Sequence, residues 1–554
     1  MKNRFSELFH SKGVNYYSDD LPLQAALAFF GFEGDSDLSG LGRFVSEEFI
    51  EALDYIDHYG KPVLKPWSLT GERIDYVRLS PEHRYILDRL QRFGLISKMV
   101  NGSESLFYHF VTGYVVSDSG IFCTFTLTAQ TAYALQKYAD EGTRRSFLPK
   151  FSDPEEPWYG ATFYTEIQGG SDLGANKTVA RERDDGFLIS GPDKYFASNA
   201  GIADGAVVTA RIEGSKDGAK GISTFFVPAL RRDGSRNYTI RRLKDKLGTV
   251  AVPTGEVEFD DAEAFLLGSR EYGIYVAMEI LSISRIDDAI AAVGIARKAF
   301  WEACIYSTER YAFGKRISDH ELLARDMVEM EAELEAAMVV SLMAAREFDS
   351  ASGSMPPYDE RYNLSRLLAS LAKNVAAETS AMVTRYSMEI AGGIGFLEEF
   401  PMAKFHRDSI VTSIWEGTSN IQALEMLETI VRKKADISLI KRMKELIASL
   451  KDRALASDLE KETTLLFERI GRVLKSGEGE FHSKTILMEI GELVATVLMF
   501  SIADRSAPGS EIFRSSAKVY YARHFRMAED YRKLVLGSGS IISWMSDAAA
   551  SAKK

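Results

Sequence analysis

The sequence predicts a multi-domain α+β protein in which a helical, a β, a second helical and a third helical region follow one another. Three observations support this order. The 554 residues are too many for one ordinary hydrophobic core. Short segments rich in β-branched and aromatic residues, separated by Gly, Asp and Asn, fill residues 156–268. From about residue 270 onward, apolar residues recur every three or four positions, which is typical of helices.

The N-terminal region, residues 1–155, mixes short helical patterns with turn-rich pieces and ends near FSDPEEPW, whose prolines and acids indicate a boundary. We therefore expect an N-terminal helical domain at 1–155. Segments such as GAVVTARI and ISTFFVPA then predict a middle β domain at 156–268. The order is not the strand–helix alternation of a doubly wound nucleotide-binding sheet, and AGGIGF follows a helical run, so a dinucleotide motif is not favoured there.

The remaining chain predicts helices almost throughout. Long helical stretches are expected at 321–349 and from 361 to about 391, separated by ASGSMPPYDE, within a helical domain at 269–432. A further helical domain is expected at 433–554. Its apolar run LVATVLMFSIA is much shorter than the roughly twenty residues that span a bilayer, so it predicts a buried helix and no membrane span.

Composition and charge restrict the class of protein. The hydrophobic fraction of 45% is high enough to bury several cores. The net charge is −12, but residues 431–554 hold 22 Lys+Arg and 16 Asp+Glu, so this end of the chain is basic. The two cysteines, Cys123 and Cys304, do not form a disulfide framework, and the N-terminus has no apolar core of a signal peptide. These features fit a cytoplasmic protein, and no cluster of metal ligands is expected.

One short stretch, SIWEGTSNIQ at 413–422, places Glu416 between an aromatic residue and a run of small polar residues. Thr418, Ser419 or Asn420 can cap the helix predicted by the apolar pattern that follows. A helix N-terminus with unpaired N–H groups also suits a phosphate group. Taken alone, the stretch leaves both interpretations open.

Three stretches in this order resemble the acyl-CoA dehydrogenase flavoprotein family: FYTEIQGGSDLG followed by KYFASN, then STERYAFGKRISDHE, then EIAGGIGFLEEFPMAKFHRDSIVTSIWEGTSNIQ. The resemblance covers roughly residues 75–430. The stretch GERIDYVRLSPEHR, the Asn of EGTSN and the extra C-terminal helical block resemble the AidB-like branch. The resemblance implies an N-terminal helical domain, a middle antiparallel β-barrel or sandwich, a helical bundle and an additional C-terminal helical domain.

The resemblance also implies an activity. It implies an FAD-dependent dehydrogenase that acts on the CH–CH group of acyl-CoA thioesters, with Glu416 as the base that removes the α-proton and with hydride passing to flavin N5. Such a carboxylate needs a water-poor pocket to be sufficiently basic, and Trp415 is placed to shield it. The family's other base position falls at Ser284, which cannot act as a base. Electrons would pass to an electron-transfer flavoprotein or a similar acceptor.

The resemblance assigns the remaining site residues by motif. Phe196 and Ser198 stand where the family has a flavin-stacking Trp and a Thr near N5. Arg310 and Phe313 match contacts from a neighbouring subunit, which implies a homotetramer or dimer with FAD at the subunit interface. The implied FAD-binding residues are Tyr164, Thr165, Glu166, Ser171, Phe196, Ser198, Arg310, Phe313, Glu389, Gly392, Gly393, Gly417, Thr418 and Asn420. The implied substrate-binding residues are Ser171 and Arg285.

Some positions depart from the family pattern. Glu389 and Glu321 stand where the family has Gln, Ser282 replaces an acid, and Glu428 replaces an Arg associated with substrate. The base and the flavin loop are kept, whereas the recognition of acyl-CoA is altered.

The basic C-terminal end suggests an alternative function. If residues 511–534 form one helix, Arg514, Lys518, Arg526, Arg532 and Lys533 fall in one stripe, with Glu511 and Glu529 among them and Arg523 on the other side. Because the acids pair with the bases at helical spacing, a solvated or subunit-facing helix is favoured. The alternative is an AidB-like flavoprotein whose residues 433–554 bind DNA and whose dehydrogenase activity is vestigial.

Overall fold

The computed structural model describes residues 9–34, 36–525 and 530–552. The chain divides into two compact units. The helical unit comprises the described residues within 1–48, 110–117 and 288–554, and the sheet unit comprises residues 49–109 and 118–287. The predicted multi-domain fold of helical domains and a β domain is confirmed. The two units do not coincide with the four predicted domains, because parts of the N-terminal range belong to each unit.

The sheet unit combines short helices with the strands. Its strands β3 to β9 lie between Gly160 and Leu267, inside the predicted β range. A hairpin formed by β1 and β2 lies within the N-terminal range, which was expected to be helical. The helices are α3 Ile50–His58, α4 Pro81–Arg92, α5 Ser97–Val100, α7 Ser119–Tyr138 and α8 Glu141–Phe147. The strands are β1 Val63–Trp67, β2 Arg73–Arg78, β3 Gly160–Phe163, β4 Val179–Arg183, β5 Gly186–Ser198, β6 Gly205–Ile212, β7 Ile222–Pro228, β8 Thr239–Leu243 and β9 Thr254–Leu267.

The strand pairings close on themselves. Strand β5 pairs with β4 and β9, β9 pairs with β7, β7 pairs with β6, and β6 pairs with β4, which completes the ring. The expected barrel is therefore present, but it is mixed rather than antiparallel, because β6 runs parallel to β3 and β4. Closure pairs β4, β5, β6, β7 and β9 on both sides, whereas, among the described strands, β3 pairs only with β6 and β8 only with β9.

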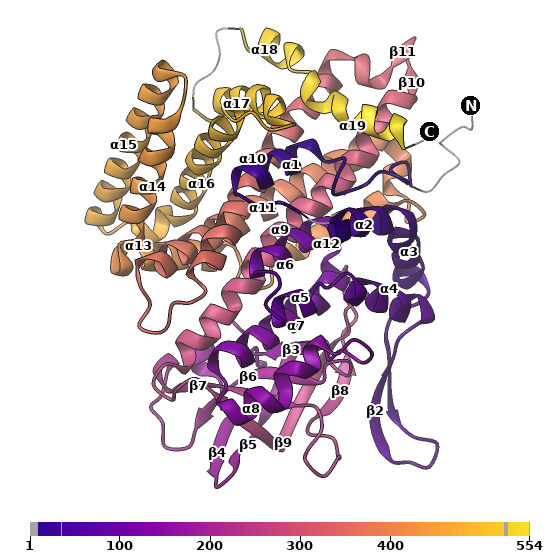
Figure 1. Ribbon diagram of the computed structural model, residues 1–554, viewed down its shortest axis with the longest axis vertical. Helices are drawn as coiled ribbons and strands as arrows, with labels where there is room; N and C mark the ends of the chain where they lie inside the picture. The colour runs from indigo at the N-terminus through magenta and orange to yellow at the C-terminus, as the bar shows by residue number, and fades with distance from the viewer. Residues whose placement is uncertain (1–8, 35, 526–529, 553–554) are drawn as a thin grey trace. The chain divides into compact units, whose positions relative to one another are not determined.

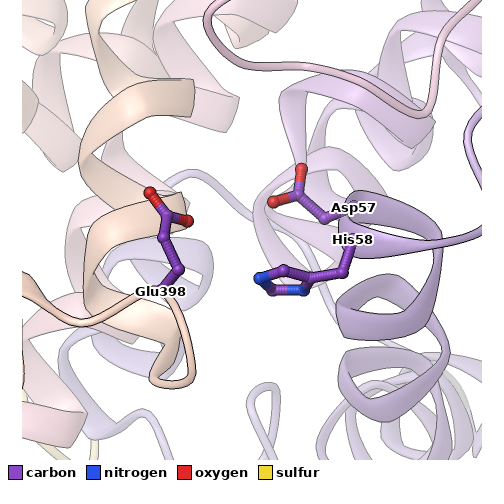
Figure 2. Close-up of side chains that lie close together, drawn as sticks. All are labelled: Asp57, His58 and Glu398. Carbon is purple, nitrogen blue, oxygen red and sulfur yellow. The ribbon is translucent and has the colours of Figure 1, made fainter.

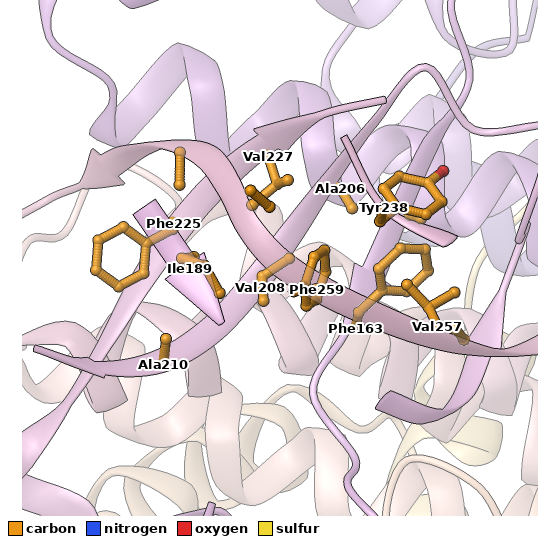
Figure 3. Close-up of a cluster of buried hydrophobic side chains, with 14 of the residues drawn as sticks. Phe163, Ile189, Ala206, Val208, Ala210, Phe225, Val227, Tyr238, Val257 and Phe259 are labelled. Carbon is orange, nitrogen blue, oxygen red and sulfur yellow. The ribbon is translucent and has the colours of Figure 1, made fainter. Parts of the chain in front are cut away.

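The interior of the barrel is apolar (Figure 3). Alternate residues of each strand point inward, so Val208 of β6, Phe225 of β7 and Phe259 of β9 meet in one buried cluster with Phe163 at the end of β3. The rings of Phe163 and Phe259 both pack edge-on against Tyr238, with centroids 5.8 and 6.0 Å apart. This core fixes the ends of β3 and β5, where five of the fourteen predicted flavin-binding residues lie.

The helical unit is dominated by long helices. The helices α10 and α11 begin and end within two residues of the predicted stretches, on either side of the predicted break. The first helices are α1 Leu21–Phe29, α2 Ser36–Phe44 and α6 Leu106–Val116, whose first residues belong to the sheet unit. The central helices are α9 Gly273–Glu309, whose first half belongs to the sheet unit, α10 Glu321–Ala351, α11 Glu360–Ala391, α12 Pro401–Ile410 and α13 Ser419–Lys433. The hairpin β10 Tyr311–Ala312 and β11 Lys315–Arg316 follows α9.

The C-terminal block is helical, as predicted. Its helices are α14 Ala435–Ser449, α15 Arg453–Ser476, α16 Gly479–Ala503, α17 Ser510–His524, α18 Tyr531–Gly537 and α19 Ser540–Ser551. Among the described residues, α16 alone is long and apolar enough to cross a membrane, but 83% of its most apolar window is buried inside the structure. It packs against α10, α11, α13 and α17, so it is the core helix of this block (Figure 1).

The basic C-terminal stripe is not one continuous helix. Arg514 and Lys518 lie on α17, Arg532 and Lys533 lie on α18, and Arg526 and Glu529 lie outside the described residues. The interpretation as a single helix over 511–534 is therefore wrong, because α17 ends at His524.

The described charges near this break pair with acids of α10. Arg523 Nε lies 3.0 Å from Glu333, and Arg532 Nε donates to Glu321 at 3.2 Å. Burial opposes protonation of His524, but the hydrogen bonds that its ring donates to Glu333 and Glu492 raise its pKa to about 9. This end of the chain is thus held by ion pairs within the unit.

A second charge cluster is buried in the middle of α10. Glu331 and Glu335 lie one helical turn apart and neither is exposed. Burial raises the pKa of Glu331 to about 7, against the attraction of Arg297. Burial and the neighbouring Glu331 raise the pKa of Glu335 well above its usual value of 4.5. The two carboxyl groups cannot both ionise easily in this interior.

This cluster predicts a pH-dependent stability. Glu335 keeps its proton in the folded state at pH values where the unfolded chain loses it, so stability falls as the pH rises above about 4.5. We expect Glu335→Gln, which mimics the neutral acid, to raise the melting temperature at pH 8 and to leave it nearly unchanged at pH 5. The measurement is a thermal melt at both pH values. Glu347→Gln, a half-buried residue of the same helix, is the control. A melting temperature at pH 8 equal to or below that of the wild type would contradict the prediction.

Candidate active site

The loop that carries Glu416 has an unusual backbone conformation. It runs from the 3-10 turn Val411–Ser413 to the start of α13. Glu416 has φ of +58°, a left-handed conformation that is rare for residues other than glycine, and Gly417 follows with φ of +98°. Such strain is found where the surroundings hold the backbone, often at functional sites. The Glu416 side chain is half-buried.

The side chain of Gln422 holds one side of this loop. Its Nε2 donates to the carbonyl oxygens of Glu416 at 3.1 Å and Gly417 at 3.0 Å. Gln422 is buried on the first turn of α13. A Cβ atom at position 417 would lie 2.9 Å from that same Nε2 atom, so the space and the φ angle both require glycine there.

The other side of the loop is held by Trp415 and by Lys373 of α11. Trp415 Nε1 donates to Oδ1 of Asp288 on α9 at 2.6 Å, and Lys373 Nζ donates to the carbonyl oxygen of Thr412 at 2.7 Å. Trp415, which precedes Glu416 in the chain, is half-buried. Sequence reasoning missed Gln422, Asp288 and Lys373, and only Gln422 was visible within the motif.

The helix start predicted at SIWEGTSNIQ is confirmed. Thr418 is the N-cap residue of α13, but its side chain makes no capping hydrogen bond. Thr418 and Asn420 are exposed at this N-terminus. The first-turn N–H groups of a helix without a side-chain cap suit an anionic group.

Two predicted partner-side residues lie on the hairpin after α9. Arg310 is exposed, and Phe313 at the tip is 97% exposed with φ of +51°. The ring of Phe313 packs edge-to-face with the ring of His320, with centroids 6.1 Å apart. An aromatic side chain presented in this way is suited to stacking on a ligand or a second subunit.

The other partner-side residues lie at the end of α11. Gly392 ends the helix with φ of +66°, Gly393 follows, and both are exposed. A Cβ atom at Gly393 would meet nothing within 4 Å, and the backbone conformation of Gly393 does not require glycine. Within this chain, neither space nor backbone explains the glycine. Glu389 is exposed and pairs with Arg385 on the same helix.

In the sheet unit, the predicted residues of β3 and β5 come together. The carbonyl oxygen of Thr165 accepts from the Tyr195 N–H at 2.8 Å. Tyr164 is buried, and the Glu166 carboxylate points inward, where it accepts from Thr178 Oγ1 at 2.5 Å and from Lys194 Nζ at 3.0 Å. The side chain of Glu166 is therefore structural, and only its backbone is available to a cofactor.

Phe196 and Ser198 lie on β5 near this junction. Phe196 is 56% exposed, and the Nζ atom of Lys244 lies 4.7 Å from the centre of its ring. Ser198 Oγ lies 3.1 Å from Oγ1 of Thr254 on β9. Ser171 is exposed in the loop after Gly169 and Gly170. The structure thus presents an open aromatic face and a hydroxyl on one strand.

The positions that depart from the family pattern have structural partners. Ser284 Oγ accepts from Gln130 Nε2 at 2.9 Å and donates to Leu281, and Ser282 donates to Met278 at 3.0 Å. Arg285, a predicted substrate residue, is only 3% exposed.

Glu428, which stands where the family has an Arg associated with substrate, itself contacts an arginine. It lies 3.2 Å from Nη2 of Arg366 on α11, which also donates to Glu425 at 2.5 Å. Glu428 therefore serves an ion pair between α11 and α13.

His58 and Glu398 in Figure 2 each have a partner within their own unit. His58 and Asp57 lie at the end of α3 in the sheet unit, and His58 Nδ1 lies 2.9 Å from the carbonyl oxygen of Asp54. Glu398 belongs to the helical unit and accepts from Arg407 Nη2 at 2.8 Å. The expectation of no metal site stays a prediction.

Comparison with known families gives matches along most of the chain. Residues 8–155 match the model described as the adaptive response protein AidB N-terminal domain. Residues 161–262 match the acyl-CoA dehydrogenase middle domain, and residues 271–431 match the acyl-CoA dehydrogenase C-terminal domain.

Individual proteins agree with these matches. The chain is 30% identical to a short-chain specific acyl-CoA dehydrogenase of Megasphaera elsdenii, over 55% of this chain and 76% of the relative. It is 28% identical to AidB of Escherichia coli (strain K12), over 78% of this chain and 81% of AidB. The crystal structure of Caenorhabditis elegans ACDH-11 in complex with C11-CoA superposes with a TM-score of 0.81 at 25% identity, covering 94% of this chain and 91% of that one.

Proposed function

Because this chain belongs to the acyl-CoA dehydrogenase family of oxidoreductases, we propose that it is an FAD-dependent dehydrogenase that forms the α,β double bond of an acyl-CoA thioester. The observation that carries the proposal is the loop of Glu416. Its backbone is held in a left-handed conformation by Gln422, Lys373 and Trp415, directly before the N-terminus of α13.

Glu416 is assigned the role of the base. Its carboxylate takes the proton from the carbon next to the thioester carbonyl and becomes a neutral carboxyl group. Half-burial beside Trp415 limits its hydration, which favours a carboxylate that accepts a proton. The rival position is unsuitable, because the hydroxyl of Ser284 is weakly basic and is already engaged with Gln130 and Leu281.

The residues present fit an FAD. Phe196 offers an exposed aromatic face, Ser198 a hydroxyl, and the exposed Gly393 leaves open the space that a Cβ atom would fill. Gly417, Thr418 and Asn420 offer the N-terminus of α13 to a phosphate group. When bound, the flavin accepts the hydride that leaves the β-carbon of the substrate. Two electrons must then leave the protein, for which we propose an electron-transfer flavoprotein or a similar acceptor.

We also propose that the protein is a homo-oligomer, a tetramer or a dimer, in the cytoplasm. The exposure of Phe313 and Arg310 on the hairpin after α9 supports this assembly, because both residues are presented for contact from outside the chain. The C11-CoA bound to ACDH-11 supports an acyl-CoA ligand for this chain. Ser282 and Glu428, which depart from the family pattern, support an altered mode of acyl-CoA recognition.

The experiment that tests the proposal is an anaerobic titration of the FAD-loaded protein with acyl-CoA thioesters of increasing chain length. We expect the visible absorbance of the flavin to bleach with at least one thioester, with one substrate consumed per flavin. A protein that binds FAD and is not bleached by any thioester of the panel would overturn the proposal.

The DNA-binding alternative draws less support from the described residues. Arg523, His524 and Arg532 are engaged with Glu333, Glu492 and Glu321, so their charges are already neutralised within the unit. A phosphate backbone would have to compete with these carboxylates. We therefore favour the dehydrogenase over the DNA-binding function.

A further inference from the structure

A buried carboxylate lies directly behind the base loop. Asp288 of α9 is 6% exposed, and its Oδ1 accepts from Trp415 Nε1 at 2.6 Å. Trp415 directly precedes Glu416 in the chain. This hydrogen bond therefore fixes the position of the residue next to the proposed base. A hydrogen bond to a charged group that is shielded from water is stronger than one at the surface.

The same carboxylate forms a buried ion pair. Its Oδ2 lies 3.3 Å from Nζ of Lys373, which is 1% exposed and also donates to the carbonyl oxygen of Thr412. Asp288 therefore contacts the loop in two ways. It bonds directly to the side chain of Trp415, and it pairs with Lys373, which bonds to Thr412. Removing one member of a buried pair leaves the other as an uncompensated charge.

These contacts explain how a strained residue persists. Glu416 has a left-handed backbone, and relaxation of this residue would swing the carboxylate away from its present direction. Gln422 holds the carbonyl groups after the bend, whereas Asp288 and Lys373 hold the residues before it. The bend is thus clamped on both sides.

We propose that Asp288 is a positioning residue for the base: through Trp415 and Lys373 it holds residues 412–417 in the conformation that presents the Glu416 carboxylate. This inference rests on the proposed function, since it takes Glu416 as the base. Asp288 does not touch the substrate in this assignment.

The charge of Asp288 adds a second, electrostatic effect. Among the described residues, the charged groups that face it are Lys373 of α11 and Glu416 of the loop. Burial raises the pKa of Asp288 to about 7, with Lys373 opposing this shift and Glu416 adding to it. As Asp288 ionises, its charge repels that of Glu416 and makes the Glu416 carboxylate a stronger base. The rate of flavin reduction is expected to rise through about pH 7 for this reason.

Two variants test the inference in the FAD-loaded protein. Asp288→Asn removes the charge, and Trp415→Phe removes the indole donor while keeping an aromatic ring. We expect each to lower the rate of flavin reduction by about 100-fold, since misplacement of a catalytic group by about 1 Å has an effect of this size, with little change in KM. We also expect Asp288→Asn to lose the rise in rate near pH 7. The double variant should lose less than the product of the two single effects, because both changes weaken the hold of Asp288 on residues 412–417.

Hydrogen exchange gives a readout that does not depend on activity. The backbone N–H of Trp415 donates to the carbonyl oxygen of Val411 at 3.1 Å. The rate of hydrogen exchange at this amide therefore reports whether the bend is formed. Peptides covering 411–418 should exchange faster in both variants. Glu302→Gln is the matched control, because Glu302 is a buried, paired carboxylate on the same helix, about 21 Å further along α9. It should leave the exchange of this loop, the rate and the pH profile unchanged.

The two possible failures are distinguishable. In one outcome, no thioester reduces the flavin of the wild-type protein, but residues 411–418 exchange faster in both variants. This result would overturn the proposed dehydrogenase function and the catalytic part of this inference. Active wild-type protein whose exchange, rate and pH profile are unchanged in Asp288→Asn and Trp415→Phe would overturn the inference and leave the proposed function in place.

Discussion

Replacing Glu416 by Gln is expected to lower the rate of flavin reduction by about 10²- to 10⁴-fold, the usual contribution of a general base. Glutamine has nearly the shape of glutamate but cannot take up the α-proton. Gln422 bonds to the backbone carbonyl oxygen of Glu416, and the substitution keeps this carbonyl group. The variant should therefore still fold and bind FAD. Stopped-flow measurement with the best acyl-CoA substrate gives the rate.

The control for this variant is Glu378→Gln. Glu378 is an exposed carboxylate on α11 whose Oε1 lies 3.4 Å from Ser419 Oγ, so it is close to the start of α13 without belonging to the predicted site. The rate of flavin reduction in Glu378→Gln should stay within about twofold of the wild-type rate, as expected for a change at the surface. If Glu416→Gln reduced its flavin as fast as the wild type, the assignment of the base would be wrong.

The second large effect is expected at Arg297, which concerns stability rather than chemistry. Arg297 is 2% exposed on α9, where its Nη1 donates to Glu331 at 2.5 Å and its Nε lies 3.3 Å from Asp20. Its guanidinium also lies 5.2 Å from the ring centre of Trp544 on α19. Arg297→Met keeps the bulk but leaves two buried carboxylates without their cation, for which we expect a loss of about 3–5 kcal/mol.

Arg532→Met is the matched control for this change. Arg532 pairs with Glu321 in the same unit, but its side chain is 71% exposed, so water replaces the lost contact and we expect a change below about 1 kcal/mol. Calorimetry should be used to separate the transitions of the two units, because a chain of this size need not unfold in one step. A loss at Arg297 no larger than that at Arg532 would show that the cluster does not stabilise the fold.

The long helices were predictable because periodicity is a local property of the chain. The stretch 321–349 became α10, and the stretch 361–391 became α11, since the break at ASGSMPPYDE is visible in the sequence. The β1–β2 hairpin was missed, because Pro66 in its first strand is unusual in the interior of a sheet and weakens the strand signal. The parallel pairing of β6 with β3 and β4 depends on residues far apart in the chain and has no local signal.

The candidate site was predictable only in part, because contacts between residues far apart in the chain leave no local signal in the sequence. Motifs identified Glu416, Phe196 and the glycines near residue 392, because each lies in a stretch that resembles a family. Asp288 is 127 residues from Trp415 and carries no motif, so its contact emerges only when α9 and the base loop are packed in three dimensions. The buried side chain of Glu166 shows the reverse case, in which a motif residue serves the fold.

The most direct test of the dehydrogenase assignment is the identity of the product. FAD-loaded protein should be mixed with one equivalent of an acyl-CoA thioester without oxygen, and the thioester should then be analysed by mass spectrometry. The account predicts an enoyl thioester that lacks two hydrogens, formed in proportion to the reduced flavin and absent with Glu416→Gln. Recovery of the unchanged thioester, across chain lengths and with FAD fully bound, would contradict the account.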